Sequence, residues 1–213
     1  MTPVSTNPSN PKSLKGRMSC NMSSCSSGLH CFRKQKKKKF PLFDVPAGNC
    51  QACGEKGLVD WERVRSRKWE DVENTIRELQ KECVRYHYWN LIEISEGAIN
   101  HARRKGRIEM RKHTEKTIRD RLGAAVNLGD GYWVPWESND AVNYARHATA
   151  TCCRGCIQYW HGIEAGRALS EGEIQYLVDL IMRFIESKII LTEHRLVIPP
   201  RRKLRQVLQV QAM

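Results

Sequence analysis

Residues 147–161 read His-Ala-Thr-Ala-Thr-Cys-Cys-Arg-Gly-Cys-Ile-Gln-Tyr-Trp-His, and the rest of the chain is organised around this stretch. Within it, Cys153, Cys156 and His161 form a C-x2-C-x4-H pattern. Two intervening residues let the backbone turn so that both thiolates reach one metal ion, and one further helical turn returns an imidazole towards them. Because Zn²⁺ prefers four nitrogen or sulfur ligands in a tetrahedron, the stretch predicts a zinc site.

A fourth ligand for this zinc can come from two places. His147 lies inside the stretch, whereas Cys50 and Cys53 form a second C-x2-C pair far away in the sequence. Joining the two pairs would give a site of four cysteines. Cys152 is not taken as a ligand, because side chains that are adjacent in sequence usually diverge; a role for Cys152 as a nucleophile has no identifiable partner residue.

The composition indicates one sizeable domain with tails. The chain has 213 residues, of which 40% are hydrophobic, and a mean hydropathy of −0.58. No apolar run reaches the roughly 20 residues that span a membrane, and no secretory signal is visible. We therefore expect a cytoplasmic protein with no membrane contact, whose nine cysteines are reduced thiols or metal ligands.

The charge balance favours a polyanionic partner. Lys and Arg total 36 against 23 Asp and Glu, a net charge of +13. Such an excess attracts nucleic acid, although charge concentrated in tails can also act on solubility alone. The cations predicted to contact phosphates are Lys36, Lys37, Lys38, Lys39, Arg103, Arg104, Lys105, Arg107, Arg154, Arg201 and Arg202.

Three regions follow from the distribution of residue types. Residues 1–39 are predicted to form a disordered basic tail, 40–191 a single zinc-binding helical domain, and 192–213 a basic C-terminal tail. The tail contains Cys20, Cys25, His30 and Cys31, whose spacing fits no established metal pattern. They could form a small metal knuckle, but we expect these side chains to be unstructured.

Hydrophobic periodicity predicts a mainly α-helical fold, with a small zinc-bound loop region. Apolar residues at steps of three and four indicate a long helix from 69 to about 96, another from 107 to 122, and a short one from 140 to 146. Ser170 and Glu173 form a capping box that starts the clearest helix, which extends to 189. His113 is expected on an inward face of its helix, in the core or at a site.

The segment from about 99 to 189 resembles an uncharacterised bacterial and archaeal domain family, whose hallmark is His-Ala-Thr-Ala-Thr-Cys-Cys-Arg followed by a cysteine and a Trp-His pair. Here the string occupies 147–154 and is followed by Cys156, Trp160 and His161. The resemblance implies that the shared core completes its own metal site from His113, His147, Cys153, Cys156 and His161, with Cys50 and Cys53 in an extension. It implies no activity.

The favoured function is a zinc-stabilised protein that binds the phosphate backbone of nucleic acid through its basic segments. One alternative is a metal-dependent hydrolase, such as a nuclease, in which a Cys/His zinc site activates water and His113 or Asp130 transfers protons. Another is a zinc-stabilised module that binds other proteins. An open position on the metal would favour the hydrolase, and a fully ligated metal would favour the other two.

Overall fold

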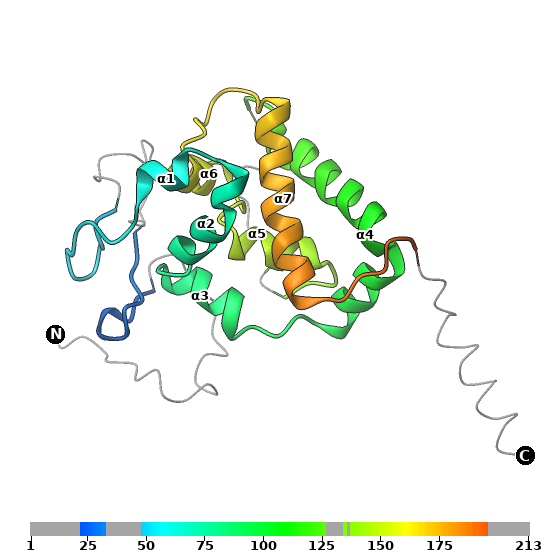
Figure 1. Ribbon diagram of the computed structural model, residues 1–213, viewed down its shortest axis with the longest axis horizontal. Coiled ribbons are helices and arrows are strands. Elements are labelled where there is room, and N and C mark those ends of the chain that lie inside the picture. The colour runs from blue at the N-terminus through cyan, green and yellow to red at the C-terminus, as the bar shows by residue number, and fades with distance from the viewer. Residues whose placement is uncertain (1–21, 33–47, 127–133, 136, 196–213) are drawn as a thin grey trace, which may run out of the picture.

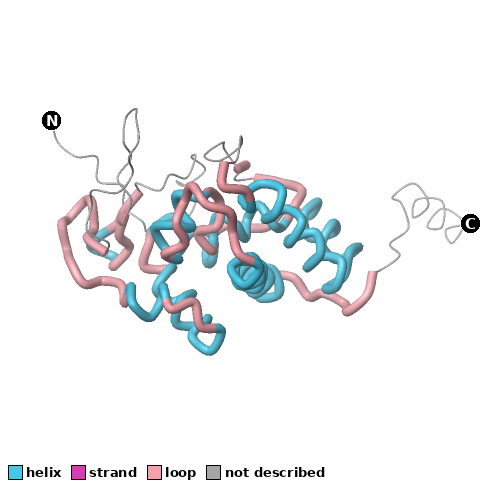
Figure 2. Tube along the Cα trace, turned by 90° about the horizontal axis from the view of Figure 1, so that it is seen from above, coloured by secondary structure: helices cyan, strands magenta, loops and turns pink. Residues whose placement is uncertain are grey.

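A computed structural model describes residues 22–32, 48–126, 134–135 and 137–195. Within these residues the fold is mainly helical and contains no β-strand, as the tube in Figure 2 shows. The predicted mainly α fold is therefore confirmed. In the same part of the chain, no helix combines the length and the apolar character needed to cross a bilayer.

Helix α7, Glu171–Lys188, forms the centre of the domain. The predicted capping box is present: the Ser170 hydroxyl accepts from the Glu173 amide at 3.3 Å, and the Glu173 carboxylate accepts from the Ser170 amide at 2.9 Å. The predicted apolar face is buried throughout, and it packs against α4 and α5 (Figure 1). That face consists of Ile174, Leu177, Val178, Ile181, Ile185 and Ile189.

The segment predicted as one long helix from residue 69 is divided. A 3₁₀ turn at Trp69–Asp71 leads into α2, Val72–Leu79, and α3 begins only at Cys83 and ends at Asn90. The backbone is extended at Glu82, with φ −84° and ψ 123°. Neither Gly nor Pro occurs in the sequence at this break. The Glu82 carboxylate points into the core there and accepts hydrogen bonds from Arg85 and Trp160.

Helix α4, Glu96–Ile118, changes direction at Gly106, where φ is 68° and ψ is 177°. The helix predicted from residue 107 is its second half; the first half extends from residue 96. The amides of Arg107 and Ile108, freed by the kink, donate to the carbonyl groups of Thr192 and Glu193. A π-helical turn, η4 at Arg119–Gly123, continues from α4.

The stretch 147–161 spans the end of α5, Ala141–Ala148, a tight turn, and α6, Arg154–His161. Helix α5 packs against α3 and α7, and α6 packs against α1, Trp61–Arg65. The predicted short helix from residue 140 is thus α5. Its N-cap is Asp140, whose carboxylate accepts from the Val142 amide at 3.1 Å.

Residues 22–32, assigned above to the N-terminal tail, pack against the folded domain. Phe32 is fully buried and contacts the rings of Trp61 and Trp160 edge-on. The His30 amide donates to the Lys81 carbonyl, and its carbonyl accepts from the Cys83 amide. This part of the chain therefore belongs to the domain. Residues 1–21 and 33–47, and residues 196–213 of the predicted C-terminal tail, lie outside the described residues.

Candidate metal centres

The first candidate centre consists of Cys25, His30, Cys50 and Cys53. Their ligand atoms all lie within 4.8 Å of one another. The sulfurs of Cys25 and Cys50 are 3.7 Å apart, as are the Cys53 sulfur and the His30 Nδ1. Four soft or borderline ligands converging from two chain segments could hold a metal ion.

Tight backbone turns shape this centre. Cys25 begins a 3₁₀ turn, η2 at Cys25–Ser27, which closes at Gly28 with φ 70°. Gly54, directly after Cys53, has φ 78°, a left-handed conformation that glycine adopts without steric cost. Burial opposes the Cys50 thiolate, but hydrogen bonds from backbone amides of Cys53, Cys31 and Ala52 outweigh it and lower its pKa to about 6. Cys50 is thereby favoured as an anionic ligand.

A second group consists of Cys152, Cys153 and Cys156, whose sulfurs also lie within 4.8 Å of one another. The Cys153 sulfur caps α6 by accepting from the Cys156 amide, and the Cys152 and Cys156 sulfurs are 3.4 Å apart. Cys153 has an extended backbone, with φ −156° and ψ 163°, at the start of the helix. This turn brings Cys152 to the same place as its neighbour, contrary to the divergence assumed from adjacency.

Guanidinium groups surround the three thiols. Arg85 donates to the Cys156 sulfur at 3.5 Å and to the His147 carbonyl at 2.6 Å. Arg146 is buried and donates to the carbonyl groups of Thr151 and Cys152. Burial lowers the pKa of Arg146, while the neighbouring Cys152 and Cys153 raise it. Hydrogen bonding to Cys153 and Cys156 and burial raise the pKa of the Cys152 thiol well above its usual value. The three sulfurs could still hold a metal ion, which would replace their protons.

The two C-x2-C pairs thus fall into separate groups, and neither predicted histidine is a member of either group. The His147 Nε2 lies 3.0 Å from the Val134 carbonyl, and the ring stacks on Tyr88. The His161 Nε2 lies 3.0 Å from the Thr149 carbonyl, and its Nδ1 lies 3.2 Å from the Tyr176 hydroxyl. Burial lowers the pKa of both imidazoles to about 4, so both are neutral at pH 7; His161 is fully buried and His147 is half-buried.

His113 lies on α4, half-buried, with its Nε2 2.7 Å from the Asp140 carboxylate. Together with His101 these residues make a third group with ligand atoms within 4.8 Å of one another. Trp160 is buried and donates to Glu82 at 2.9 Å, so it supports the core. Asp130, the alternative proton-transfer residue, lies outside the described part of the chain.

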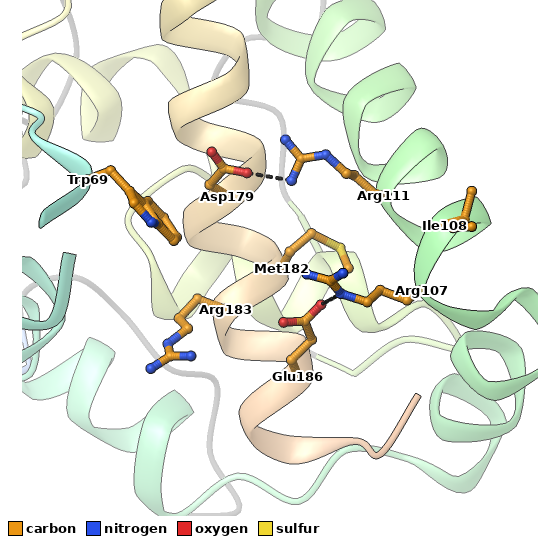
Figure 3. A pocket seen from close by; sticks show the side chains of 8 residues that line it. All are labelled: Trp69, Arg107, Ile108, Arg111, Asp179, Met182, Arg183 and Glu186. Atoms are coloured by element: carbon orange, nitrogen blue, oxygen red, sulfur yellow. Dashed lines mark hydrogen bonds and ion pairs between the residues drawn. The ribbon is translucent and has the colours of Figure 1, made fainter. Parts of the chain in front are cut away.

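The basic residues divide into paired and unpaired cations. Arg103 and Arg104 are exposed, Lys105 is half-buried, and none of the three forms an ion pair with a described residue. Arg107 instead pairs with Glu186 of α7 at 2.7 Å. Figure 3 shows Arg107 and the neighbouring Arg111 directed at carboxylates of α7, around a hollow of about 390 Å³.

Arg154, also predicted to contact phosphate, lies inside the domain. Its side chain is 1% exposed and donates to the carbonyl groups of Leu122, Glu164 and Arg167. It connects η4 to the segment between α6 and α7, and it has no access to an external phosphate. The remaining predicted cations lie outside the described residues: Lys36, Lys37, Lys38, Lys39, Arg201 and Arg202.

Sequence reasoning missed four of the residues grouped here: Cys25, His30, His101 and Asp140. Cys25 and His30 have the same x4 spacing as Cys156 and His161. This similarity could have suggested that Cys25 and His30 join Cys50 and Cys53 in one site. His101 gave no such signal. Its proximity to His113 depends on the kink at Gly106, and a helical pattern does not reveal the size of a kink.

These features define a helical domain with Cys/His groups that could bind metal. Residues 73–186 match the family described as domain of unknown function DUF4186, and the chain belongs to this family. The match contains the three-cysteine group and the His/His/Asp group, whereas Cys25, His30, Cys50 and Cys53 precede it. No solved structure matches the chain.

Proposed function

We propose that this chain is a zinc-stabilised protein that binds the phosphate backbone of nucleic acid. The zinc would sit between Cys25, His30, Cys50 and Cys53. A tetrahedral zinc with bonds of about 2.3 Å to sulfur holds its ligand atoms about 3.5–3.8 Å apart. The two distances of 3.7 Å in this group agree with that spacing.

A structural role for this zinc follows from the number of ligands. Four protein ligands fill a tetrahedron and leave no position for water or substrate, as in structural rather than catalytic sites. The ion would join the segment 22–32 to the loop after residue 48, which already meet through a backbone hydrogen bond from the Gln51 amide to the Cys31 carbonyl at 2.7 Å. In this proposal metal binding contributes to the stability of the N-terminal part of the domain.

The observation that carries the nucleic-acid proposal is the run of unpaired cations at Arg103, Arg104 and Lys105. Other α4 cations are neutralised: Lys112 pairs with Glu109 and Lys116 with Asp120. Arg195, from the C-terminal segment, joins Arg104 and Lys105 around one hollow of about 280 Å³. Unpaired cations on one surface can release counterions from a phosphate backbone at little cost.

Fluorescence anisotropy with labelled single-stranded and double-stranded DNA and RNA, measured over a range of salt concentrations, tests this function. The full chain should bind with an affinity that falls steeply as salt rises. In Arg103→Ala/Arg104→Ala, the slope of log affinity against log salt should decrease by about 2, one unit for each lost phosphate contact.

The matched control is Lys112→Ala/Lys116→Ala, which removes the same charge from the same helix but takes cations that already have carboxylate partners. Its slope should stay close to that of the wild type. Equal losses in both variants would mean that only net charge matters, and absence of binding by the wild type at low salt would reject the proposal.

A further inference from the structure

His101, His113 and Asp140 form a compact group on the side of the domain where α4 meets α5. The His113 Nε2 lies 2.7 Å from the Asp140 Oδ2, and the His101 Nδ1 lies 3.8 Å from the Asp140 Oδ1. The two imidazole rings meet edge to face with centroids 5.4 Å apart. Each of the three side chains is between 26% and 28% exposed, so an ion from solvent can reach them.

The kink at Gly106 creates this arrangement. In a straight helix, residues 101 and 113 would be separated by about 18 Å along the axis, too far for one ion. The left-handed backbone at Gly106 folds the two halves of α4 towards each other and brings the imidazoles together. A glycine therefore stands at the point that assembles the group, where the positive φ disfavours other residues.

One nitrogen in the group makes no hydrogen bond to the described residues. The His101 Nδ1 is buried, and its distance of 3.8 Å to the Asp140 carboxylate is beyond hydrogen-bonding range. A buried polar atom without a partner is costly and calls for an explanation such as a missing ion. Burial also lowers the pKa of His101, which favours the neutral imidazole that a metal requires.

We propose that His101, His113 and Asp140 bind a divalent first-row transition-metal ion. Two imidazoles and one carboxylate form the ligand set of non-haem Fe²⁺ and of several catalytic zinc sites. With ligand bonds of about 2.1 Å, the three donor atoms would lie about 3.0–3.4 Å apart. The observed distances of 2.7 Å and 3.8 Å run to the two different oxygens of the Asp140 carboxylate, and one donor atom from each residue lies within 4.8 Å of the others, so the side chains would have to move closer together to bind the ion.

Neighbouring groups already hold the carboxylate in place. The Asp140 Oδ1 accepts from the Val142 amide, and the Asp140 amide donates to the Ser138 hydroxyl. Hydrogen bonds of this kind orient metal ligands in established sites. Three protein ligands leave coordination positions open, unlike the four-ligand centre at Cys25. His101 also lines the hollow that contains Arg104 and Lys105, so an anionic ligand could approach beside the metal.

Cobalt(II) is a suitable probe because its spectrum distinguishes sulfur from nitrogen and oxygen ligands. Cobalt on the cysteine groups gives intense thiolate charge-transfer absorption, whereas cobalt on two imidazoles and a carboxylate gives only weak visible bands. The full chain is dialysed against Co²⁺ without nucleic acid, and bound cobalt per chain is counted alongside the spectrum. The test is therefore independent of the function proposed above.

The variants His101→Ala and Asp140→Asn should each lose about one cobalt per chain with the thiolate absorption unchanged. Asn retains the capping ability of Asp140, and His101 contributes no hydrogen bond from Nδ1, so both variants should fold. Asp120→Asn, at an exposed carboxylate paired only with Lys116, is the control and should bind as much cobalt as the wild type. Equal cobalt in all four proteins, or only thiolate-bound cobalt in the wild type, would overturn the proposal.

Discussion

Glu82 and Arg85 form an ion pair at 2.9 Å in which both side chains are almost completely buried, 1% and 0% exposed. The pair lies between Trp160, which donates to Glu82, and Cys156, whose sulfur accepts from Arg85. Glu82 lies at the break between α2 and α3, where its backbone is extended. The pair thus connects the helical core to the three-cysteine group.

Replacing Arg85 with Leu should destabilise the domain severely. The change leaves the Glu82 carboxylate buried without its cation, a situation that typically costs about 3–5 kcal/mol. Urea denaturation followed by circular dichroism gives the free energy of unfolding. The control is Arg63→Leu, which breaks an ion pair to Asp71 on the surface and should cost about 0–1 kcal/mol. Similar losses in both variants would contradict the importance of the buried pair.

Gly106→Ala should lower the thermal stability of the protein. The backbone there has φ 68°, and an added Cβ would approach the His194 carbonyl oxygen to 2.4 Å. The cost should exceed about 1 kcal/mol, since backbone strain and steric overlap add. At Gly172, in α7, a Cβ meets nothing within 4 Å, and Ala there should stabilise by about 0.5–1 kcal/mol. Calorimetric melting of both variants should therefore give shifts of opposite sign.

Acidification should destabilise the domain through His147 and His161. Their folded pKa values are about 4, below the usual value near 6.5, so the unfolded state takes up protons first as pH falls. Stability is present above about pH 6.5 and is lost between there and pH 4, by up to about 1.4 kcal/mol per pH unit for each histidine.

Urea denaturation at several pH values measures this loss. In His161→Gln the dependence on pH should be roughly halved, whereas His194→Gln, at an exposed residue, should follow the wild type. Parallel curves for all three proteins would show that other groups cause the acid sensitivity.

Cys25→Ser should remove about one zinc per chain. The proposed centre loses one of its four ligands, and elemental mass spectrometry of purified protein counts the metal directly. Cys83→Ala is the control, because Cys83 is buried but belongs to none of the groups of candidate ligands among the described residues. If Cys25→Ser retained all its zinc while Cys153→Ser lost it, the metal would reside in the three-cysteine group instead.

The helical core was predictable because its cause is local. The apolar face of α7 and the capping box of Ser170 and Glu173 depend on residues three or four positions apart, and the structure contains both. The break at Glu82 was not predictable from propensity. There the Glu82 carboxylate accepts a local hydrogen bond from Arg85 and a long-range one from Trp160, far along the chain, which no local pattern reveals.

The grouping of metal ligands was predictable only in part. C-x2-C spacing correctly indicates sulfurs that can approach each other, since Cys50 and Cys53 share one group and Cys153 and Cys156 share another. Spacing does not indicate which segments meet. The segment with Cys25 and His30 is held beside Cys50 by the packing of Phe32 against Trp61 and Trp160 and by backbone hydrogen bonds of His30 to Lys81 and Cys83, long-range contacts that no local pattern encodes.

The amides at the middle of α4 have an unusual dependence on a distant segment. A helix normally completes its first hydrogen bonds with a neighbouring side chain, but Arg107 and Ile108 use the carbonyl groups of Thr192 and Glu193. Loosening of residues 192–195 would therefore open α4 at its centre and not at its ends. Amide protons at 107 and 108 would then exchange with solvent early, so the motion of the C-terminal segment could be followed from inside a helix.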